Sequence, residues 1–199
     1  ELFEEEEEDD AEEESPPQLG RPPQGVSEFK NFTEAELASL RRCLELLKQG
    51  DNNDPKLEAV IGYLRGTYPG VTRAWLDLGC VLFSQYYDTV RWIGDELSKR
   101  GEFAGMDIGL YAGSNRSGFW RDGRFQRCDR NVLKGRVRAG DLKLLLGTDA
   151  ASEGLNLQRL GTLVNIDLPW NPTRLEQRKG CIQRIGQART EIWIANLRY

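Results

Sequence analysis

Histidine is absent from this chain of 199 residues, and cysteine is scarce. The four cysteines, Cys43, Cys80, Cys128 and Cys181, lie far apart and form no CxxC pair. Zinc fingers need Cys or His ligands at short spacings, and the Ser/His/Asp and Cys/His triads need a histidine. The sequence therefore excludes these sites and acid–base catalysis by histidine, and we expect no metal site. A domain of this size needs no disulfide scaffold, so we expect a reduced, cytoplasmic protein.

Long apolar runs are also missing. No stretch approaches the ~20 apolar residues that span a bilayer, and the sequence does not open with a signal peptide. We therefore expect no membrane partner. Because the chain begins with Glu1 rather than methionine and stops soon after an apolar run, we interpret it as a piece of a longer protein.

Charge is distributed unevenly along the chain. Residues 1–14 hold 11 acidic residues and no basic one, which leaves 21 acids against 27 Lys and Arg elsewhere, a net charge of about +6. The acidic block runs into SPPQLGRPPQG, where proline and glycine oppose regular structure and like charges repel. We interpret residues 1–27 as a disordered acidic, Pro-rich linker. The alternative is an acidic arm that mimics nucleic acid and covers a basic surface.

Two helices are predicted next. The first is expected over residues 34–49, where Thr33 and Glu36 form a capping box ahead of an apolar stripe. The stripe consists of Leu37, Leu40, Cys43, Leu44 and Leu47. The second helix is expected to begin after Asp54, which is a favourable N-cap before proline, and to end near Gly66.

From residue 54 onward, short apolar runs alternate with polar, helix-like stretches. Strands are expected over residues 78–83, 106–111, 142–146, 162–166 and 192–197, and helices over residues 86–99, 131–139 and 172–179. Such apolar strands, separated by helices, indicate a parallel sheet covered on both faces. The expected fold class is α/β, a doubly wound parallel sheet flanked by helices, with ligands beyond the carboxyl ends of the strands. We divide the chain into a linker (1–27), a helical connector (28–53) and one folded domain (54–199).

Three polar stretches follow the predicted strand ends. They are FSQY at residues 83–86, GTDAASEGLN at residues 147–156, and LPWNP at residues 168–172, which leads into LEQRKGCIQRIGQ. Arginines near a glycine suit phosphate recognition, because the guanidinium fork matches two phosphate oxygens. For Arg178 and Arg184, this interpretation competes with that of surface arginines on a helix.

These stretches resemble the motifs of helicase superfamily 2, and they are most similar to bacterial Swi/Snf-type (HepA-like) translocases. FSQY looks like motif IV, TDAASEGLN like motif V and QRKGCIQRIGQ like motif VI, in the order that the family shows. The resemblance covers about residues 54–199 and implies a RecA-like helicase C-terminal lobe.

The resemblance also implies roles for individual positions. Arg184 matches the arginine finger that reaches the γ-phosphate of ATP, while Gln177 and Arg178 match residues that contact nucleotide or link it to the nucleic-acid site. The implied cofactor-binding residues are Gly154, Leu155, Asn156 and Cys181. The implied nucleic-acid-binding residues are Ser84, Gln85, Gly113, Ser114 and Thr148. Two positions depart from the family pattern, since many relatives carry aspartate at position 156 and arginine at position 181.

A GxxxxGK[ST] phosphate loop and a DExH or DEAD box are absent from the sequence. In phosphoryl transfer the phosphate loop and the metal-binding acid hold MgATP, whereas the arginine finger stabilises developing charge. The resemblance therefore implies the second motor lobe of an ATP-dependent helicase or translocase, inert when alone. ATP and Mg would be held mainly by an N-terminal RecA-like lobe of the same parent chain, and double-stranded DNA is the implied partner.

The stretch 116–143 is unusually basic. It holds nine Lys and Arg, three acids, and the aromatic residues Phe119, Trp120 and Phe125. One interpretation is salt-dependent phosphate contact, with the aromatic side chains acting as a wedge or as a contact with the other lobe. The other interpretation is a solvated helix face.

Two other functions compete with a motor lobe. One is a non-catalytic nucleic-acid-binding module with a RecA-like fold and a degenerate ATP site, which Cys181 favours. The other is a flavodoxin-like nucleotide-binding domain, which the lack of a Gly-rich first turn disfavours.

Overall fold

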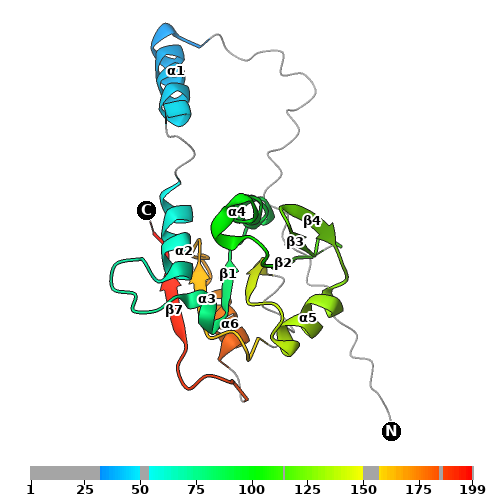
Figure 1. Ribbon diagram of the computed structural model, residues 1–199. Helices are drawn as coiled ribbons and strands as arrows, with labels where there is room; N and C mark the ends of the chain where they lie inside the picture. Colours follow the sequence, from blue (N-terminus) through cyan, green and yellow to red (C-terminus); the bar gives the residue numbers. More distant parts are fainter. Residues whose placement is uncertain (1–31, 50–53, 114, 150–156, 184–185, 199) are drawn as a thin grey trace.

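The computed structural model describes residues 32–49, 54–113, 115–149, 157–183 and 186–198. A seven-stranded sheet with the order β4-β3-β2-β5-β1-β6-β7 forms its centre (Figure 1). The strands are β1 (Cys80–Phe83), β2 (Ile108–Tyr111), β3 (Gly118–Arg121), β4 (Arg124–Arg127), β5 (Leu144–Gly147), β6 (Thr162–Asn165) and β7 (Trp193–Asn196). The helices are α1 (Glu34–Gln49), α2 (Pro55–Arg65), α3 (Trp75–Leu78), α4 (Tyr87–Lys99), the 3-10 turn η1 (Gly101–Phe103), α5 (Arg130–Ala139) and α6 (Pro172–Ile182).

Five strands of the sheet run parallel. β1 lies between β5 and β6, β2 pairs with β5, and β7 pairs with β6, all in parallel register. β3 and β4 form an antiparallel hairpin on the outer side of β2. The α/β fold class expected from the alternation of apolar runs and helices is confirmed.

The core lies on both faces of this sheet. On one face Leu82 of β1 belongs to a cluster with Val60 of α2 and Ile93 of α4. On the other face Val81 packs in a cluster with Leu133 of α5 and with α6. Because side chains alternate along a strand, β1 is buried on both sides, which explains why its sequence is apolar without a break. Because both faces of the sheet are packed against helices, the polar loops lie at the two ends of the strands.

Helix α2 begins and ends where the sequence predicts. The Asp54 carboxylate accepts hydrogen bonds from the backbone N–H groups of Lys56 and Leu57 at 2.8 and 2.9 Å. Gly66 ends the helix with a φ of 75°, a left-handed conformation that glycine adopts without strain.

The predicted strand over residues 78–83 is wrong at its beginning. Leu78 is the last residue of the short helix α3, and the strand starts only at Cys80. Gly79, with a φ of 79°, turns the chain between the two elements. Trp75 of α3 is buried in the core, so the apolar run that the sequence shows belongs to two elements.

The β3–β4 hairpin is absent from the sequence-based prediction, which placed no strand between residues 111 and 142. Asp122 and Gly123 form its two-residue turn, both with positive φ (50° and 73°). This is the geometry that Asp-Gly favours in tight hairpins, because it matches the twist of the flanking strands. The basic stretch is therefore divided between this hairpin and α5.

Helix α1 lies apart from the sheet in Figure 1. Its predicted capping box is present, since the Thr33 N–H donates to Glu36 Oε2 at 2.8 Å and the Glu36 N–H donates to Thr33 Oγ1 at 3.3 Å. Leu40 and Leu44 of its apolar stripe are 47% and 55% exposed, so packing does not explain the stripe. Within the described residues, no helix has the length and apolar character needed to cross a bilayer.

Candidate functional site

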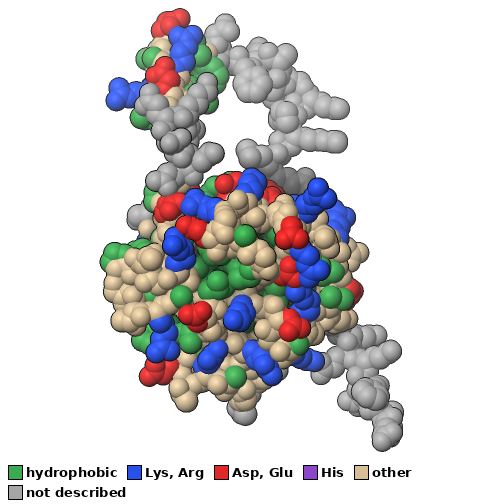
Figure 2. Space-filling view, viewed as in Figure 1, with side chains coloured by type: hydrophobic (Ala, Val, Ile, Leu, Met, Phe, Trp, Pro, Cys, Tyr) green, Lys and Arg blue, Asp and Glu red, His purple; other side chains and the backbone are tan. Residues whose placement is uncertain are grey.

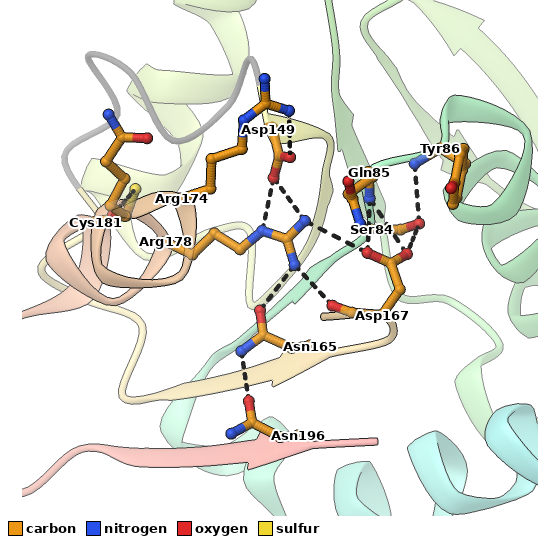
Figure 3. Close-up of polar contacts among 11 residues, drawn as sticks. Ser84, Gln85, Tyr86, Asp149, Asn165, Asp167, Arg174, Arg178, Cys181 and Asn196 are labelled. Carbon is orange, nitrogen blue, oxygen red and sulfur yellow. Dashed lines mark hydrogen bonds and ion pairs between the residues drawn. The ribbon is translucent and has the colours of Figure 1, made fainter. Parts of the chain in front are cut away.

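Polar residues follow the carboxyl ends of β1, β5 and β6, which are neighbouring parallel strands. Figure 3 shows the side chains of Ser84, Asp149 and Asp167 converging at this edge. Ser84 directly follows β1, Thr148 directly follows β5, and Asp167 is the second residue after β6. Ser84 and Thr148 are buried although they are polar. A buried polar group needs a partner, so the contacts at this edge decide its geometry.

The turn after β1 is fixed by Asp167. The Ser84 hydroxyl donates to the Asp167 carboxylate. The Gln85 N–H donates to both carboxylate oxygens, at 3.0 and 3.2 Å, and the Tyr86 N–H donates to Ser84 Oγ at 3.1 Å. The serine hydroxyl therefore uses its only hydrogen inside the protein, and it orients the loop between β1 and α4.

Arg178 of α6 is the centre of a buried polar network. Its side chain is fully buried. Nε donates to Asp149 Oδ1 at 2.6 Å, and Nη1 donates to Asn165 Oδ1 at 3.1 Å and to the Asp167 carbonyl oxygen at 3.0 Å (Figure 3). This burial excludes the interpretation of Arg178 as a surface arginine. The guanidinium joins α6 to the ends of β5 and β6.

The network continues beyond Arg178. Its Nη2 lies 3.5 Å from Asp167 Oδ1, and Asp149 also forms an ion pair with Arg174 Nη1 at 3.4 Å. The Asn165 amide donates to Asn196 Oδ1 of β7 at 2.8 Å. Two carboxylates therefore share one buried guanidinium, and they compensate its charge inside the protein.

The start of α6 is determined by a cap at the end of an exposed loop. Asn171 Oδ1 accepts from the Thr173 N–H at 2.9 Å, and Pro172 occupies the first turn, where a missing N–H costs nothing. Trp170, directly before the cap, is 99% exposed. This loop connects Asp167 and its hydrogen-bond partners to α6.

Two predicted site residues of α6 face different environments. Gln177 is exposed. Cys181 is buried, its Sγ donates to the Gln177 carbonyl oxygen at 3.4 Å, and its own carbonyl oxygen accepts from the Leu157 N–H at 3.2 Å. Cys181 belongs to the apolar cluster around Val81.

The turn after β2 reaches the same edge. Gly113 is buried, and its carbonyl oxygen accepts from the Arg116 N–H at 3.1 Å. The Ala112 carbonyl oxygen accepts from Arg130 Nε at 3.2 Å. The Thr148 N–H donates to the Tyr111 carbonyl oxygen at 3.3 Å, which connects this turn to the end of β5.

The structure brings together Ser84, Gln85, Gly113, Thr148 and Arg178 at the carboxyl edge of the sheet. Five predicted site residues lie outside the described residues: Ser114, Gly154, Leu155, Asn156 and Arg184. The network residues Asp149, Asn165 and Asp167 were missed as site residues. Their position directly at or after the strand ends was the available signal.

The described residues at this edge can support a nucleotide site, but they offer no uncompensated buried cation to bind a phosphate. Its buried cation, Arg178, is engaged by two carboxylates, so charge for a phosphate has to come from elsewhere. Among the described residues, no group of three or more Cys, Asp or Glu is arranged to hold a metal ion.

The aromatic residues of the basic stretch belong largely to the core. Trp120 is buried, its indole N–H donates to Asp95 Oδ1 at 2.6 Å, and the Arg91 guanidinium lies 3.8 Å from the ring centre of Phe125. Burial excludes Trp120 as an exposed wedge.

Asp107, ahead of β2, holds two arginines of the basic stretch. Arg121 Nε donates to its Oδ1 at 2.9 Å, and Arg136 also pairs with it. The hydrogen bond from Arg121, together with the smaller contribution of Arg136, lowers the pKa of this carboxyl, although partial burial opposes the shift. These two arginines therefore have structural partners.

Comparison with known proteins identifies residues 79–186, more than half of the chain, as a Helicase conserved C-terminal domain. A curated relative, "Uncharacterized ATP-dependent helicase YqhH" of Bacillus subtilis (strain 168), is 45% identical over 75 residues, which cover 38% of this chain and 13% of that protein. The chain thus matches only a small part of that relative's length.

Two solved structures show the same fold at low identity. The C-terminal part of the Fun30 ATPase domain aligns with a TM-score of 0.52 and 20% identity over 83% of this chain and 50% of that chain. The Pyrococcus furiosus Hef helicase domain aligns with a TM-score of 0.53 and 19% identity over 80% of this chain and 30% of that chain. Together with the match to the domain family, this likeness confirms the RecA-like fold, and the chain belongs to the helicase conserved C-terminal domain family.

Proposed function

We propose that this chain is the second motor lobe of an ATP-dependent DNA helicase or translocase of the Swi/Snf type, and that it is inert without a first lobe from the same parent chain. The observation that carries the proposal is the convergence of three motifs at one edge of the sheet. Arg178 of the third motif is buried against Asp149 of the second, and Asp167 connects both to Ser84 of the first. Residues from distant parts of the sequence therefore form one rigid support.

The proposed ATP-facing residues lie on and beside α6. Arg184 acts as the arginine finger, and Gln177, which is exposed on the helix, contacts nucleotide. ATP, held with its Mg ion mainly by the first lobe, would supply the phosphoryl group. The finger would stabilise the charge that develops on this group during transfer. Arg178 is a positioning residue, because its buried guanidinium is engaged by Asp149 and Asp167. Gly154, Leu155, Asn156 and Cys181 complete the proposed nucleotide side.

The proposed nucleic-acid track follows the loops after β1, β2 and β5. It consists of Ser84, Gln85, Gly113, Ser114 and Thr148. The hydroxyl of Ser84 orients its loop through Asp167, so the partly exposed Gln85 beside it is the group that can reach a phosphate. Because Arg178 and Asp167 connect this loop to α6, a movement of α6 toward nucleotide also moves the track.

The experiment that tests the proposal is Arg184→Ala in the parent protein. Removal of an arginine finger costs ~10³-fold or more in ATP turnover, while nucleotide binding stays largely intact because the finger acts on the transition state. Steady-state ATPase assays with duplex DNA, together with nucleotide-binding titrations, measure both quantities. Unchanged turnover would refute the finger assignment.

Cys181 favours a second candidate function, a non-catalytic nucleic-acid-binding module with a degenerate ATP site. A thiol carries no fixed positive charge and is a weak donor, and this one is turned into the apolar core. ATPase assays of the parent protein with and without duplex DNA separate the two functions. A parent that binds DNA but hydrolyses no ATP would establish the module.

A further inference from the structure

A groove crosses the amino edge of the sheet, opposite to the site described above. It consists of two adjoining hollows of about 260 and 360 Å³ that share Arg159 and Ala188. Its lining residues precede β1, β5, β6 and β7, and others come from the C-terminal end of α5. We call it the amino-edge groove. Each strand has four residues, and each residue adds ~3.3 Å. The amino-edge groove and the carboxyl edge are therefore separated by roughly one strand length.

Four cationic side chains line the amino-edge groove: Arg138, Lys143, Arg159 and Arg189. All four are exposed. None of them forms an ion pair with a carboxylate among the described residues. Lys and Arg side chains gather in the lower part of Figure 2, over the region between α3 and α5 in Figure 1. One carboxylate, that of the exposed Asp77, also lines the groove, so four cations face one anion. The excess of like charges is repulsive, and a bound anion removes that repulsion.

Two of these arginines each make one long hydrogen bond to a backbone carbonyl oxygen. Arg159 Nη1 donates to the Ala139 carbonyl oxygen at 3.5 Å, and Arg189 Nη2 donates to the Asp77 carbonyl oxygen at 3.4 Å. Each contact uses one of five guanidinium hydrogens, so the others stay available to a ligand.

Glycines make room for both side chains. A Cβ atom at Gly140 would lie 3.1 Å from Arg159 Nη1, and one at Gly161 would lie 3.1 Å from Arg189 Cγ. The groove therefore presents guanidinium groups whose orientation is partly fixed before a ligand arrives, which lowers the entropic cost of binding.

The chemistry of the lining selects the ligand. The described residues that line the groove include no aromatic side chain, and the leucines Leu142 and Leu160 are buried beneath it. Base stacking needs exposed aromatic rings, and a protein interface needs apolar anchors. Arginines suit phosphate oxygens, which their forks bind in pairs.

We propose that the amino-edge groove binds the phosphodiester backbone of nucleic acid, independently of base sequence, as a second contact on the edge opposite to the motor site. The proposal rests on the proposed function only in taking nucleic acid as the partner. It does not depend on ATP chemistry, on Arg184 or on Arg178.

The test compares two double variants of this chain that each remove two positive charges. Arg159→Gln with Arg189→Gln changes the groove. Arg65→Gln with Lys99→Gln is the control, because these residues are exposed and pair with Glu102 and Glu96 away from the groove. Binding of a fluorescent duplex is measured by anisotropy from about 50 to 200 mM salt.

The groove variant is expected to lose roughly tenfold in affinity at the lower salt, and its plot of log K against log salt is expected to flatten by about 1.8, since each phosphate contact contributes ~0.9 to the slope. The control variant is expected to behave like the wild-type chain. Equal affinities and slopes for the two variants would overturn the proposal, as would a wild-type chain that does not bind the duplex.

A footprint locates the contact. Acylation of Lys143, read by mass spectrometry, is expected to slow when duplex is added, whereas that of the exposed Lys99 stays unchanged. Acidic segment 1–14 is the competing occupant. To test this occupant, the footprint is repeated on a chain that lacks residues 1–27. The proposal fails if residues 1–27 protect Lys143 in the full chain, added duplex does not displace them, and duplex does not protect Lys143 in the shortened chain. In that case the groove is occupied by the acidic segment. Failure of the proposed motor function appears separately, as unchanged ATP turnover in the Arg184→Ala parent.

Discussion

At the scale of single residues, Arg178 carries the most structural weight in the described site. It is fully buried and contacts two carboxylates, an amide oxygen and a carbonyl oxygen. A buried guanidinium is tolerated only because each of these oxygens compensates its charge. Removing it leaves Asp149 and Asp167 facing one another without a cation between them.

Arg178→Ala is therefore expected to lower the free energy of unfolding by about 3–5 kcal/mol, the cost of breaking a buried ion pair from one side. Urea unfolding followed by circular dichroism measures the change. The matched control is Arg65→Ala, whose exposed ion pair with Glu102 is worth less than about 1 kcal/mol. Similar losses in both variants would mean that the network contributes little to stability.

Cys181 gives a second prediction at this scale. Cys181→Arg in the parent protein is expected to raise DNA-stimulated ATPase activity by roughly tenfold or more if the arginine side chain leaves the apolar cluster and reaches the phosphates, a charged contact worth about 1.5–3 kcal/mol. Cys181 is buried, so the melting temperature of the variant has to be measured beside its activity. A folded variant with equal or lower activity would show that this chain has rebuilt its phosphate site.

The residue scale also shows where sequence reasoning stops. Ser84, Gln85 and Thr148 could be placed at one edge, because parallel strands bring their carboxyl ends together. The partners of Arg178 could not be predicted, since Asp149, Asn165 and Asp167 lie 11 to 29 residues away from it and only the strand order makes them neighbours. The apparent surface arginine was thus a buried one.

At the scale of elements, the hairpin and α4 fit together through one glycine. A Cβ atom at Gly94 of α4 would lie 2.2 Å from Cη2 of Trp120 on β3. The helix and the hairpin can therefore approach this closely only with glycine at that position.

Gly94→Ala is expected to destabilise the protein by about 1–3 kcal/mol through overpacking, although alanine favours helix. The control is Gly135→Ala on α5, where a Cβ atom meets nothing within 4 Å. That variant is expected to gain up to ~1 kcal/mol from helix propensity. Thermal or urea unfolding of the pair gives opposite signs if the contact with Trp120 is responsible.

Asp107 connects β2 to the hairpin and to α5, and it makes this connection pH-dependent. Arg121 and Arg136 lower its pKa, so its stabilising contribution is present above the ordinary range near pH 4 and is lost as the pH falls through the lowered value. Asp107→Asn is expected to flatten the fall in unfolding free energy on acidification. Urea unfolding at a series of acidic pH values tests this, and an unchanged slope would contradict it.

Elements differed in how well they could be predicted. The central strands were recognised because burial on both faces leaves a continuous apolar run, as at Val81 and Leu82. The hairpin was missed because its short strands, GFWR and RFQR, mix arginines with aromatic residues at the sheet edge and show no continuous apolar run. Asp122-Gly123 was the overlooked signal.

At the scale of the whole molecule, the acidic block and the basic body have opposite charges. Residues 1–14 carry 11 acids, while the remainder has a net charge of about +6. Deletion of residues 1–27 is expected to tighten nonspecific DNA binding at low salt, with a smaller effect at high salt, where screening weakens the competition. Equal low-salt affinities of the two chains, measured by anisotropy titration, would leave residues 1–27 with the role of a linker only.

The exposed indole of Trp170 gives the molecule an optical property. It lies in the loop between Asp167 and the start of α6, beside the edge where a first lobe would dock, while Trp75 and Trp120 are buried in the core. An indole in water emits at longer wavelength than one in an apolar contact. Docking of another body on this edge would therefore change the emission of Trp170. Because Trp92 and Trp193 are also exposed, at 41% and 47%, replacing these two with phenylalanine isolates the signal, and the chain would then report docking of a first lobe without an added dye.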